Sequence, residues 1–162
     1  MSEVICNTSP IQYLHQLELL HILPELVGQV IIPSAVIKEL EAGRKLGINL
    51  PDLTTLDWVT IRQPVNLSAL ALVVNLGPGE TEVLMLALES NDPIVILDDA
   101  LARRMAKMLN IRLTGTLGLL IDAKNAGLIS LAEPVLNQLQ TLGFRLAPKT
   151  RLEVLRMANE LP

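Results

Sequence analysis

Short apolar runs alternate along the chain with longer stretches in which apolar residues recur every three or four positions. The clearest run is Ile94–Leu97, which is four residues long, mostly β-branched and free of charge. A run of this kind is typical of a strand that is buried on both faces, as in a parallel sheet. Four further runs predict strands: Glu3–Cys6, Val30–Ile32, Trp58–Ile61 and Ile111–Leu113.

The stretches between these runs have helical spacing. Apolar residues from Ile11 to Leu20 fall on one helix face, and Thr8 or Ser9 can cap that helix ahead of Pro10. Further helices are expected at 24–27 before Gly28, from Ser34 to Gly43, at 67–75, from Glu80, from the Asp98-Asp99 pair, and at about 117–126, 131–141 and 148–159. Strands that alternate with helices predict an α/β fold, with a parallel sheet between helical layers.

Length and composition narrow the class of protein. A chain of 162 residues is typical of one domain with a sizeable core. Half of the residues are apolar and the mean hydropathy is +0.43, yet no apolar run approaches the roughly 18 residues of a membrane span. The N-terminus has no signal-peptide pattern, and the single cysteine cannot form an internal disulfide. We therefore expect a cytoplasmic protein without a membrane segment, and the excess of Leu and Ile suggests self-association.

Charge is distributed unevenly along the chain. The net charge is −4, but residues 1–100 carry −9 and residues 101–162 carry +5. This asymmetry allows an acidic metal site beside a basic surface for phosphates. The alternative is that these charges only solvate helix faces.

Polar residues follow three of the predicted strands at the point where each strand ends. They are Asn7-Thr8-Ser9, Asp98-Asp99 and Thr114-Gly115-Thr116, and predicted helices add Glu39 and Glu80. Carboxyl ends of parallel strands meet at one sheet edge, where ligands of open α/β sheets bind. Clustered carboxylates repel one another, and a hard cation such as Mg²⁺ or Mn²⁺ offsets that repulsion. Each acid alone is typical of a solvated helix end, whereas the combined pattern indicates metal-assisted phosphodiester chemistry.

Other chemistries have weaker support in the sequence. There is no P-loop, and Gly77 and Gly79 lack the third glycine of a dinucleotide site. His15 and His21 lie in an apolar helical pattern without cysteine partners, so we expect neither to bind a metal. Cys6 lies within a predicted strand, which favours a buried, unreactive thiol.

Five stretches carry a resemblance to the PIN-domain superfamily of toxin-like nucleases. They are CNTSPIQYL (6–14), IIPSAVIKEL (31–40), LGPGETEVLMLAL (76–88), ILDDALARRMA (96–106) and TGTLGLLIDAKNAGLI (114–129). More narrowly, the chain is similar to a prokaryotic branch of predicted nucleic-acid-binding proteins. The resemblance implies a three-layer α/β/α sandwich with a central, mostly parallel sheet, formed as one domain over residues 1–162 with the helices at about 131–159 as an extension.

The resemblance also implies an acidic pocket that binds Mg²⁺ or Mn²⁺ and cuts RNA with metal-activated water. The family's metal-binding and catalytic positions fall on Asn7, Glu39, Glu80 and Asp99, with Asp98 beside the last; Ser9 and Thr116 match supporting polar positions. Phosphates of the RNA would be positioned by Arg103, Arg104 and Arg112.

Two functions follow from this resemblance. The first is a metal-dependent endoribonuclease, the toxin of a toxin–antitoxin pair with an antitoxin protein as partner. The second is a catalytically weak or inactive module that binds nucleic acid or protein, because Asn7 stands where the family usually has Asp. An Asn side chain can still offer a carbonyl oxygen, but it lacks a negative charge and should lower metal affinity. PIN-like domains commonly dimerise, so a homodimer is expected.

Overall fold

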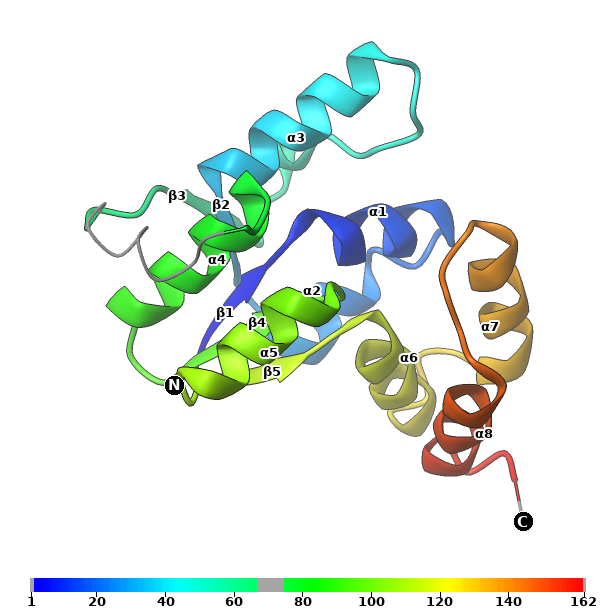
Figure 1. The fold of residues 1–162 in the computed structure, drawn as a ribbon. Coiled ribbons are helices and arrows are strands. Elements are labelled where there is room, and N and C mark those ends of the chain that lie inside the picture. The colour runs from blue at the N-terminus through cyan, green and yellow to red at the C-terminus, as the bar shows by residue number, and fades with distance from the viewer. Residues whose placement is uncertain (1, 67–74, 162) are drawn as a thin grey trace.

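The computed structural model describes residues 2–66 and 75–161 (Figure 1). Its centre is a five-stranded sheet, all parallel, in the order β3-β2-β1-β4-β5. The strands are β1 (Glu3–Cys6), β2 (Val30–Pro33), β3 (Val59–Arg62), β4 (Pro93–Ile96) and β5 (Arg112–Thr114). All five predicted strands are present, and the ends of the last four differ from the prediction by one residue at one or both ends.

The helices join these strands and extend the chain beyond them. Within the described residues they are α1 (Thr8–Gln16), α2 (Ile22–Val27), α3 (Ser34–Lys45), α4 (Pro78–Glu89), α5 (Ala100–Met108), α6 (Thr116–Asn125), α7 (Ala132–Thr141) and α8 (Pro148–Met157), with a 3₁₀ turn at Leu53–Thr55. None of the helices in ranges 2–66 and 75–161 is both long and apolar enough to cross a membrane. The helix expected at 67–75 lies almost wholly outside the described residues.

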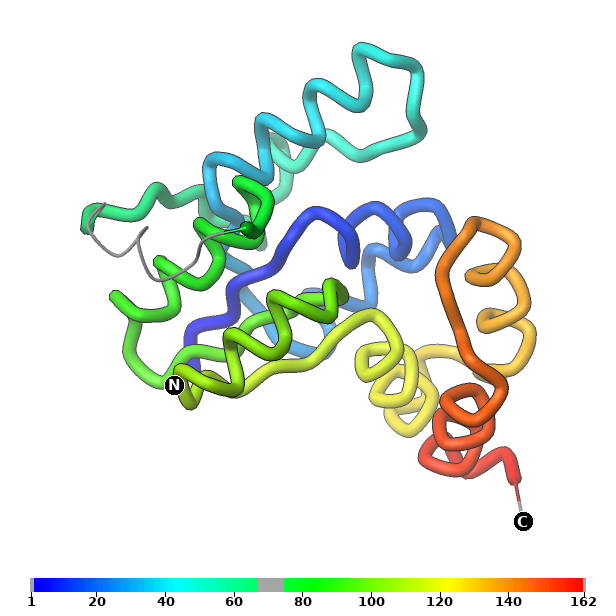
Figure 2. The backbone as a smooth tube through the Cα atoms, in the orientation of Figure 1, coloured from blue at the N-terminus to red at the C-terminus, as the bar shows by residue number. Residues whose placement is uncertain are grey.

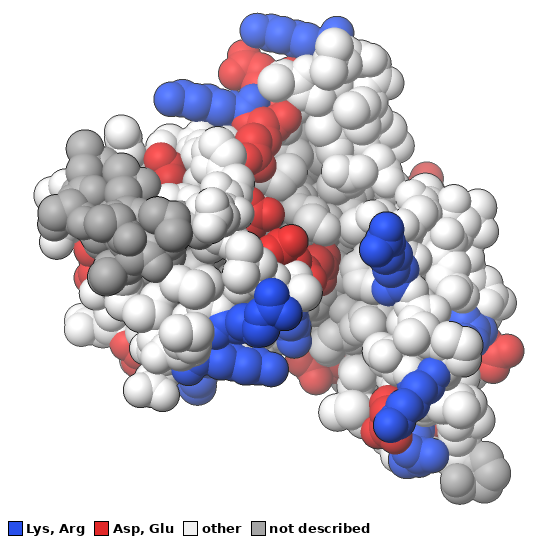
Figure 3. Space-filling model, in the orientation of Figure 1, with Lys and Arg blue, Asp and Glu red and all other residues white. Residues whose placement is uncertain are grey.

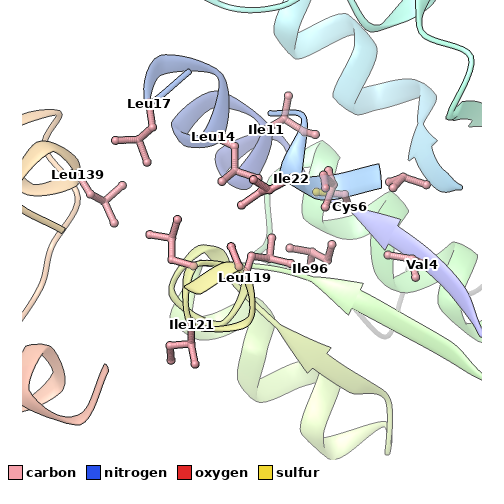
Figure 4. Packing of buried hydrophobic residues seen from close by; sticks show 14 of the residues in the cluster. Val4, Cys6, Ile11, Leu14, Leu17, Ile22, Ile96, Leu119, Ile121 and Leu139 are labelled. Carbon is pink, nitrogen blue, oxygen red and sulfur yellow. The ribbon is translucent and has the colours of Figure 1, made fainter. Parts of the chain in front are cut away.

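Alternate residues of the strands face two different cores. Ile5, Val95 and Leu97 pack with α4 and α5, whose buried side chains include Val83 and Ala102. The opposite face carries a second, larger core, in which strand residues meet side chains of α1, α2, α3 and α6–α8 (Figure 4). Helices thus cover both faces of the sheet, and the predicted three-layer α/β/α fold is confirmed.

Two helix boundaries differ from the prediction for identifiable reasons. The N-cap of α1 is Asn7, not Thr8 or Ser9, because the hydroxyls of those two residues donate to carboxylates elsewhere in the fold. Gly43 does not end α3, which continues to Lys45. Instead Gly43 lies against Leu50, whose Cδ1 would clash with a Cβ on Gly43, so the glycine permits close packing.

The strand order places a topological switch point at β1. From β1 the chain proceeds through β2 to β3 on one side, and then crosses to β4 and β5 on the other. Cys6 pairs with Ile96 at the carboxyl ends of β1 and β4. Ligands of open α/β sheets bind outside this edge at the switch point. The link from α7 to α8 returns past α1, close to the same edge (Figure 2).

Candidate functional site

A cleft of about 420 Å³ opens at this switch point. Its lining residues come from the ends of β1 and β4, from α1 and α4, and from the link between α7 and α8: Asn7, Ser9, Tyr13, Glu80, Asp98, Asp99, Gly143, Phe144 and Arg145. Acidic side chains gather along a hollow in the centre of one face of the molecule, and basic side chains lie on either side of it (Figure 3). The cleft is therefore the candidate functional site of the protein.

Asp98 is held rigidly at the end of β4. Its Oδ2 accepts hydrogen bonds from Ser9 Oγ at 2.9 Å and Thr116 Oγ1 at 2.6 Å, and its Oδ1 accepts from the Thr116 backbone N–H at 2.8 Å. Thr116 is the first residue of α6 and is fully buried. The amino end of a helix favours a carboxylate, so α6 and two hydroxyls together fix this side chain.

Glu39 is fixed from the other side of the site. Its Oε1 accepts the Gly79 N–H at 3.0 Å, and its Oε2 accepts from the hydroxyl of Thr8. Gly79 lies in the first turn of α4, so a second helix amino end orients a second carboxylate. A side chain at Gly79 would force these groups to shift, because a Cβ would lie 2.7 Å from Asn7 Oδ1 and 2.8 Å from Glu39 Oε2.

Asn7 is the unusual member of the site. Its side chain is only 3% exposed, and its Oδ1 is buried without a hydrogen-bond donor in the described structure. The oxygens near Gly79 belong to acceptors, so none of them can satisfy Oδ1. A buried acceptor without a partner is costly, and a cation or a donor at this point would remove the cost.

Glu80 and Asp99 lie at helix starts and are more accessible. Glu80 is in the first turn of α4 and is partly buried, and its carboxylate has no hydrogen-bond or ion-pair partner among residues 2–66 and 75–161. Asp99 is exposed and caps α5, where its Oδ2 accepts the Ala102 N–H at 2.9 Å. Glu80 is therefore free to bind a ligand, whereas one oxygen of Asp99 is already engaged.

The oxygen-bearing side chains of the site are suited to a hard divalent cation that takes only a few ligands from the protein. The candidate metal-ligand atoms, which are carboxylate oxygens and Asn7 Oδ1, are all oxygens, and the unpartnered Asn7 Oδ1 lies beside Glu39. The described part of the chain contains no group of three His, Cys, Asp or Glu residues placed to hold a metal ion together. Mg²⁺ commonly keeps several waters and takes only one or two carboxylates, so such a set is compatible with Mg²⁺ or Mn²⁺ but not with a closed zinc site.

The three predicted phosphate-binding arginines lie in different places. Arg103 stands beside the site, where its Nη1 donates to the Leu97 carbonyl at 2.8 Å and thereby supports the end of β4. Arg104 is exposed on α5. Arg112 begins β5 at the opposite edge of the sheet, where its Nη2 bonds Asp92 at 2.6 Å and Ser2 at 2.8 Å. The structure therefore does not bring Arg112 to the cleft.

Several residues in and around the cleft were not predicted to take part in the site. Thr8 was predicted as a possible helix cap and as one of the polar residues after the first strand, but not as a partner of Glu39, and Gly79 was given no role in the site. Tyr13, Phe144 and Arg145 follow no local pattern, because they reach the cleft from opposite ends of the chain. The one available signal was scarcity, since the chain has a single Tyr and a single Phe.

Two neighbouring groups are held in their protonated forms. Burial, and then the charge of Asp98, raise the pKa of the Cys6 thiol well above its ordinary value. The same two causes, in the same order, raise the pKa of the Tyr13 phenol. At neutral pH, Cys6 is thus not a nucleophile, and Tyr13 brings a hydroxyl proton to the cleft.

Comparison with known proteins agrees with this architecture. A family model described as a PIN domain matches residues 3–160. Neither the curated proteins nor the solved structures contain a match to the chain. PIN domains form a nuclease-like superfamily that generally uses divalent metal ions, in keeping with the oxygen-lined cleft. The family model spans nearly the whole sequence, and the chain therefore belongs to the PIN-domain family.

Proposed function

We propose that this protein is an endoribonuclease that depends on Mg²⁺ or Mn²⁺ and hydrolyses RNA phosphodiesters. The observation that carries the proposal is the buried, unpartnered Asn7 Oδ1, which lies beside the Glu39 carboxylate at the switch point of the sheet. A buried acceptor beside a carboxylate favours a bound cation, and such an ion can activate water and stabilise charge on a phosphodiester.

The residues in and around the cleft would have three roles: to bind the metal ion, to orient a carboxylate and to contact the RNA. Asn7 Oδ1 and one or two of the carboxylates of Glu39, Glu80, Asp98 and Asp99 would hold the ion, with waters as its remaining ligands, and the ion when bound would activate a water and neutralise charge on the phosphate. Ser9 and Thr116 fix the direction of the Asp98 carboxylate. Arg104 is exposed on α5 and would contact the RNA backbone, while Arg103 holds the end of β4 in position.

The test is cleavage of a single-stranded RNA in Mn²⁺ by the wild type and by Glu80→Gln. We expect cleavage that EDTA abolishes and that Glu80→Gln reduces by about 100-fold or more, because the Glu80 carboxylate lines the cleft and has no partner among the described residues. Glu41→Gln is the matched control, since Glu41 is an exposed glutamate on α3 outside the cleft. Equal cleavage by Glu80→Gln and wild type would contradict the proposal.

A second candidate is a catalytically weak or inactive module that binds RNA or a protein. Two observations favour it: Asn7 removes one charge from the site, and no three-residue metal cluster of His, Cys, Asp or Glu is present in the described ranges. Asn7→Asp separates the candidates. If only this variant cuts RNA, the natural site is degenerate; if the wild type already cuts and Glu80→Gln abolishes cleavage, the protein is a nuclease.

The wider biological setting is also a proposal. We propose a cytoplasmic toxin that is held by an antitoxin protein and that forms a homodimer. Leu46 and Ile48 support an apolar contact of this kind, because they follow α3 and are 81% and 45% exposed. Light scattering at micromolar concentration tests the dimer, and a monomeric mass would contradict it.

A further inference from the structure

One wall of the cleft is neither acidic nor part of the metal-binding set. It consists of Tyr13 from α1 together with Phe144 and Arg145 from the link between α7 and α8. The two rings pack edge to face, with centroids 5.2 Å apart and an interplanar angle of 79°. They are the only Tyr and Phe of the chain, so two of its three aromatic residues lie at the acidic cleft.

Both rings have a structural role, but part of the surface of each ring remains exposed in the cleft. Each packs against the larger core and so fixes the α7–α8 link onto α1. Each is nevertheless only partly buried and lines the cleft. Partly exposed aromatic surface beside a phosphate-processing site is what proteins use to stack the bases of single-stranded nucleic acids.

Arg145 adds a cation to this wall. It is exposed, and among residues 2–66 and 75–161 it forms no hydrogen bond or ion pair, although Glu80, Asp98 and Asp99 line the same cleft. Arg103, which also lies near the site, differs because its Nη1 donates to the Leu97 carbonyl. An unpaired guanidinium at the rim of a cleft is well suited to bind a phosphate oxygen.

We propose that Tyr13, Phe144 and Arg145 seat one unpaired nucleotide of the RNA beside the cleaved bond, with the base against the aromatic pair and a flanking phosphate on Arg145. This proposal rests on the proposed function and narrows its substrate to single strands, because a paired base within a duplex cannot reach the rings. The three residues position the substrate and take no part in bond cleavage. The Tyr13 hydroxyl, protonated at neutral pH, is a donor for the base or the ribose.

The test is fluorescence anisotropy of a labelled single-stranded oligoribonucleotide in EDTA, so that binding is measured without cleavage. Arg145→Gln is expected to weaken binding about 10-fold and to reduce the slope of log affinity against log salt by about one phosphate contact. Arg156→Gln is the control, because Arg156 lies on the neighbouring α8, is exposed and is paired with Glu153 instead of facing the cleft.

The proposed contact between the RNA base and the aromatic pair is tested by removing either the Tyr13 ring from the protein or the base from the oligonucleotide. Tyr13→Leu should weaken binding about 10-fold, whereas Tyr13→Phe, which keeps the ring, should stay within about 3-fold of the wild type. An oligonucleotide with abasic positions should bind the wild type and Tyr13→Leu equally. Thermal denaturation identifies variants that fail to fold, and Arg145→Gln still decides the proposal if Tyr13→Leu is one of them.

The outcomes separate this inference from the nuclease proposal. Unchanged affinity and salt slope in Arg145→Gln, or equal binding of duplex and single strand, would overturn the inference even if RNA is cut. Base-dependent binding that Arg145→Gln weakens, in a protein that never cuts RNA in Mn²⁺, would support the inference and refute the nuclease.

Discussion

Placing an aspartate at position 7 should make the stability of the fold depend on a divalent metal. In the natural chain the Asn7 amide is neutral and buried, so Glu39 has no charged neighbour on that side. Asn7→Asp keeps the shape of the side chain and adds one negative charge. Without metal this charge should destabilise the protein, and Mn²⁺ should reverse the loss.

The size of the effect follows from the geometry around Gly79. Asn7 Oδ1 and Glu39 Oε2 lie 2.7 and 2.8 Å from the same point, the position of a Cβ on Gly79. Two unit charges no more than about 6 Å apart repel by about 3 kcal/mol at an effective dielectric of about 20. Part of this repulsion is screened because Glu39 is only partly buried, so we expect a loss of about 2 kcal/mol.

Urea denaturation in EDTA and in Mn²⁺ measures both halves of this prediction. The free energy of unfolding of Asn7→Asp should be lower than that of the wild type in EDTA, and Mn²⁺ at about 100 times its Kd should restore about 2.7 kcal/mol. Asn110→Asp, an exposed change of the same kind, should lose no stability in EDTA and should gain from Mn²⁺ only what the wild type gains. If Asn7→Asp is as stable as the wild type in EDTA, position 7 does not face the Glu39 carboxylate closely and the description of the site is wrong.

Three further predictions concern the same site. Gly79→Ala should lower the free energy of unfolding, measured in urea, by about 1–3 kcal/mol, because its Cβ would lie 2.7 Å from Asn7 Oδ1. Alanine usually stabilises a helix relative to glycine, so a variant as stable as the wild type or more stable would contradict this prediction. Thr116→Val removes the hydroxyl that donates to Asp98 and should cost about 2 kcal/mol in the same assay. Burial and the charge of Asp98 raise the pKa of Tyr13, so stability should be complete below about pH 10 and fall as the pH rises through the folded-state pKa. Since Tyr13 is the only tyrosine, tyrosinate absorbance follows it directly, and a midpoint at or below the value for the unfolded chain would refute this prediction.

Local patterns were sufficient to predict the strands, the helices and their arrangement in layers. They were not sufficient to predict the order of the strands in the sheet. The Ile94–Leu97 run predicted a buried strand, and Val95, Ile96 and Leu97 are fully buried. The sequence contained no signal that β1 lies between β2 and β4, because strand pairing depends on contacts between distant segments. That order is what makes β1 the switch point and brings Asn7 and Asp98 to one edge.

The site was predictable only as far as strand ends determine it. Polar residues after β1 and β4 were expected to meet, and the structure joins Ser9 and Thr116 to Asp98. The predicted cap of α1 was Thr8 or Ser9, but the Thr8 hydroxyl bonds Glu39 from a distant helix. A side chain that can satisfy either its own helix or a distant carboxylate cannot be assigned from local sequence.

The most direct measurement is calorimetric titration of Mn²⁺ into the wild type and into a Glu80→Gln, Asp99→Asn double variant, with Glu41→Gln as the control. We predict one class of binding in the wild type and in the control, and its loss in the double variant, because Glu80 and Asp99 line the cleft while Glu41 lies outside it. No binding by the wild type at millimolar Mn²⁺, or equal binding by the double variant, would contradict a metal-dependent site in this cleft.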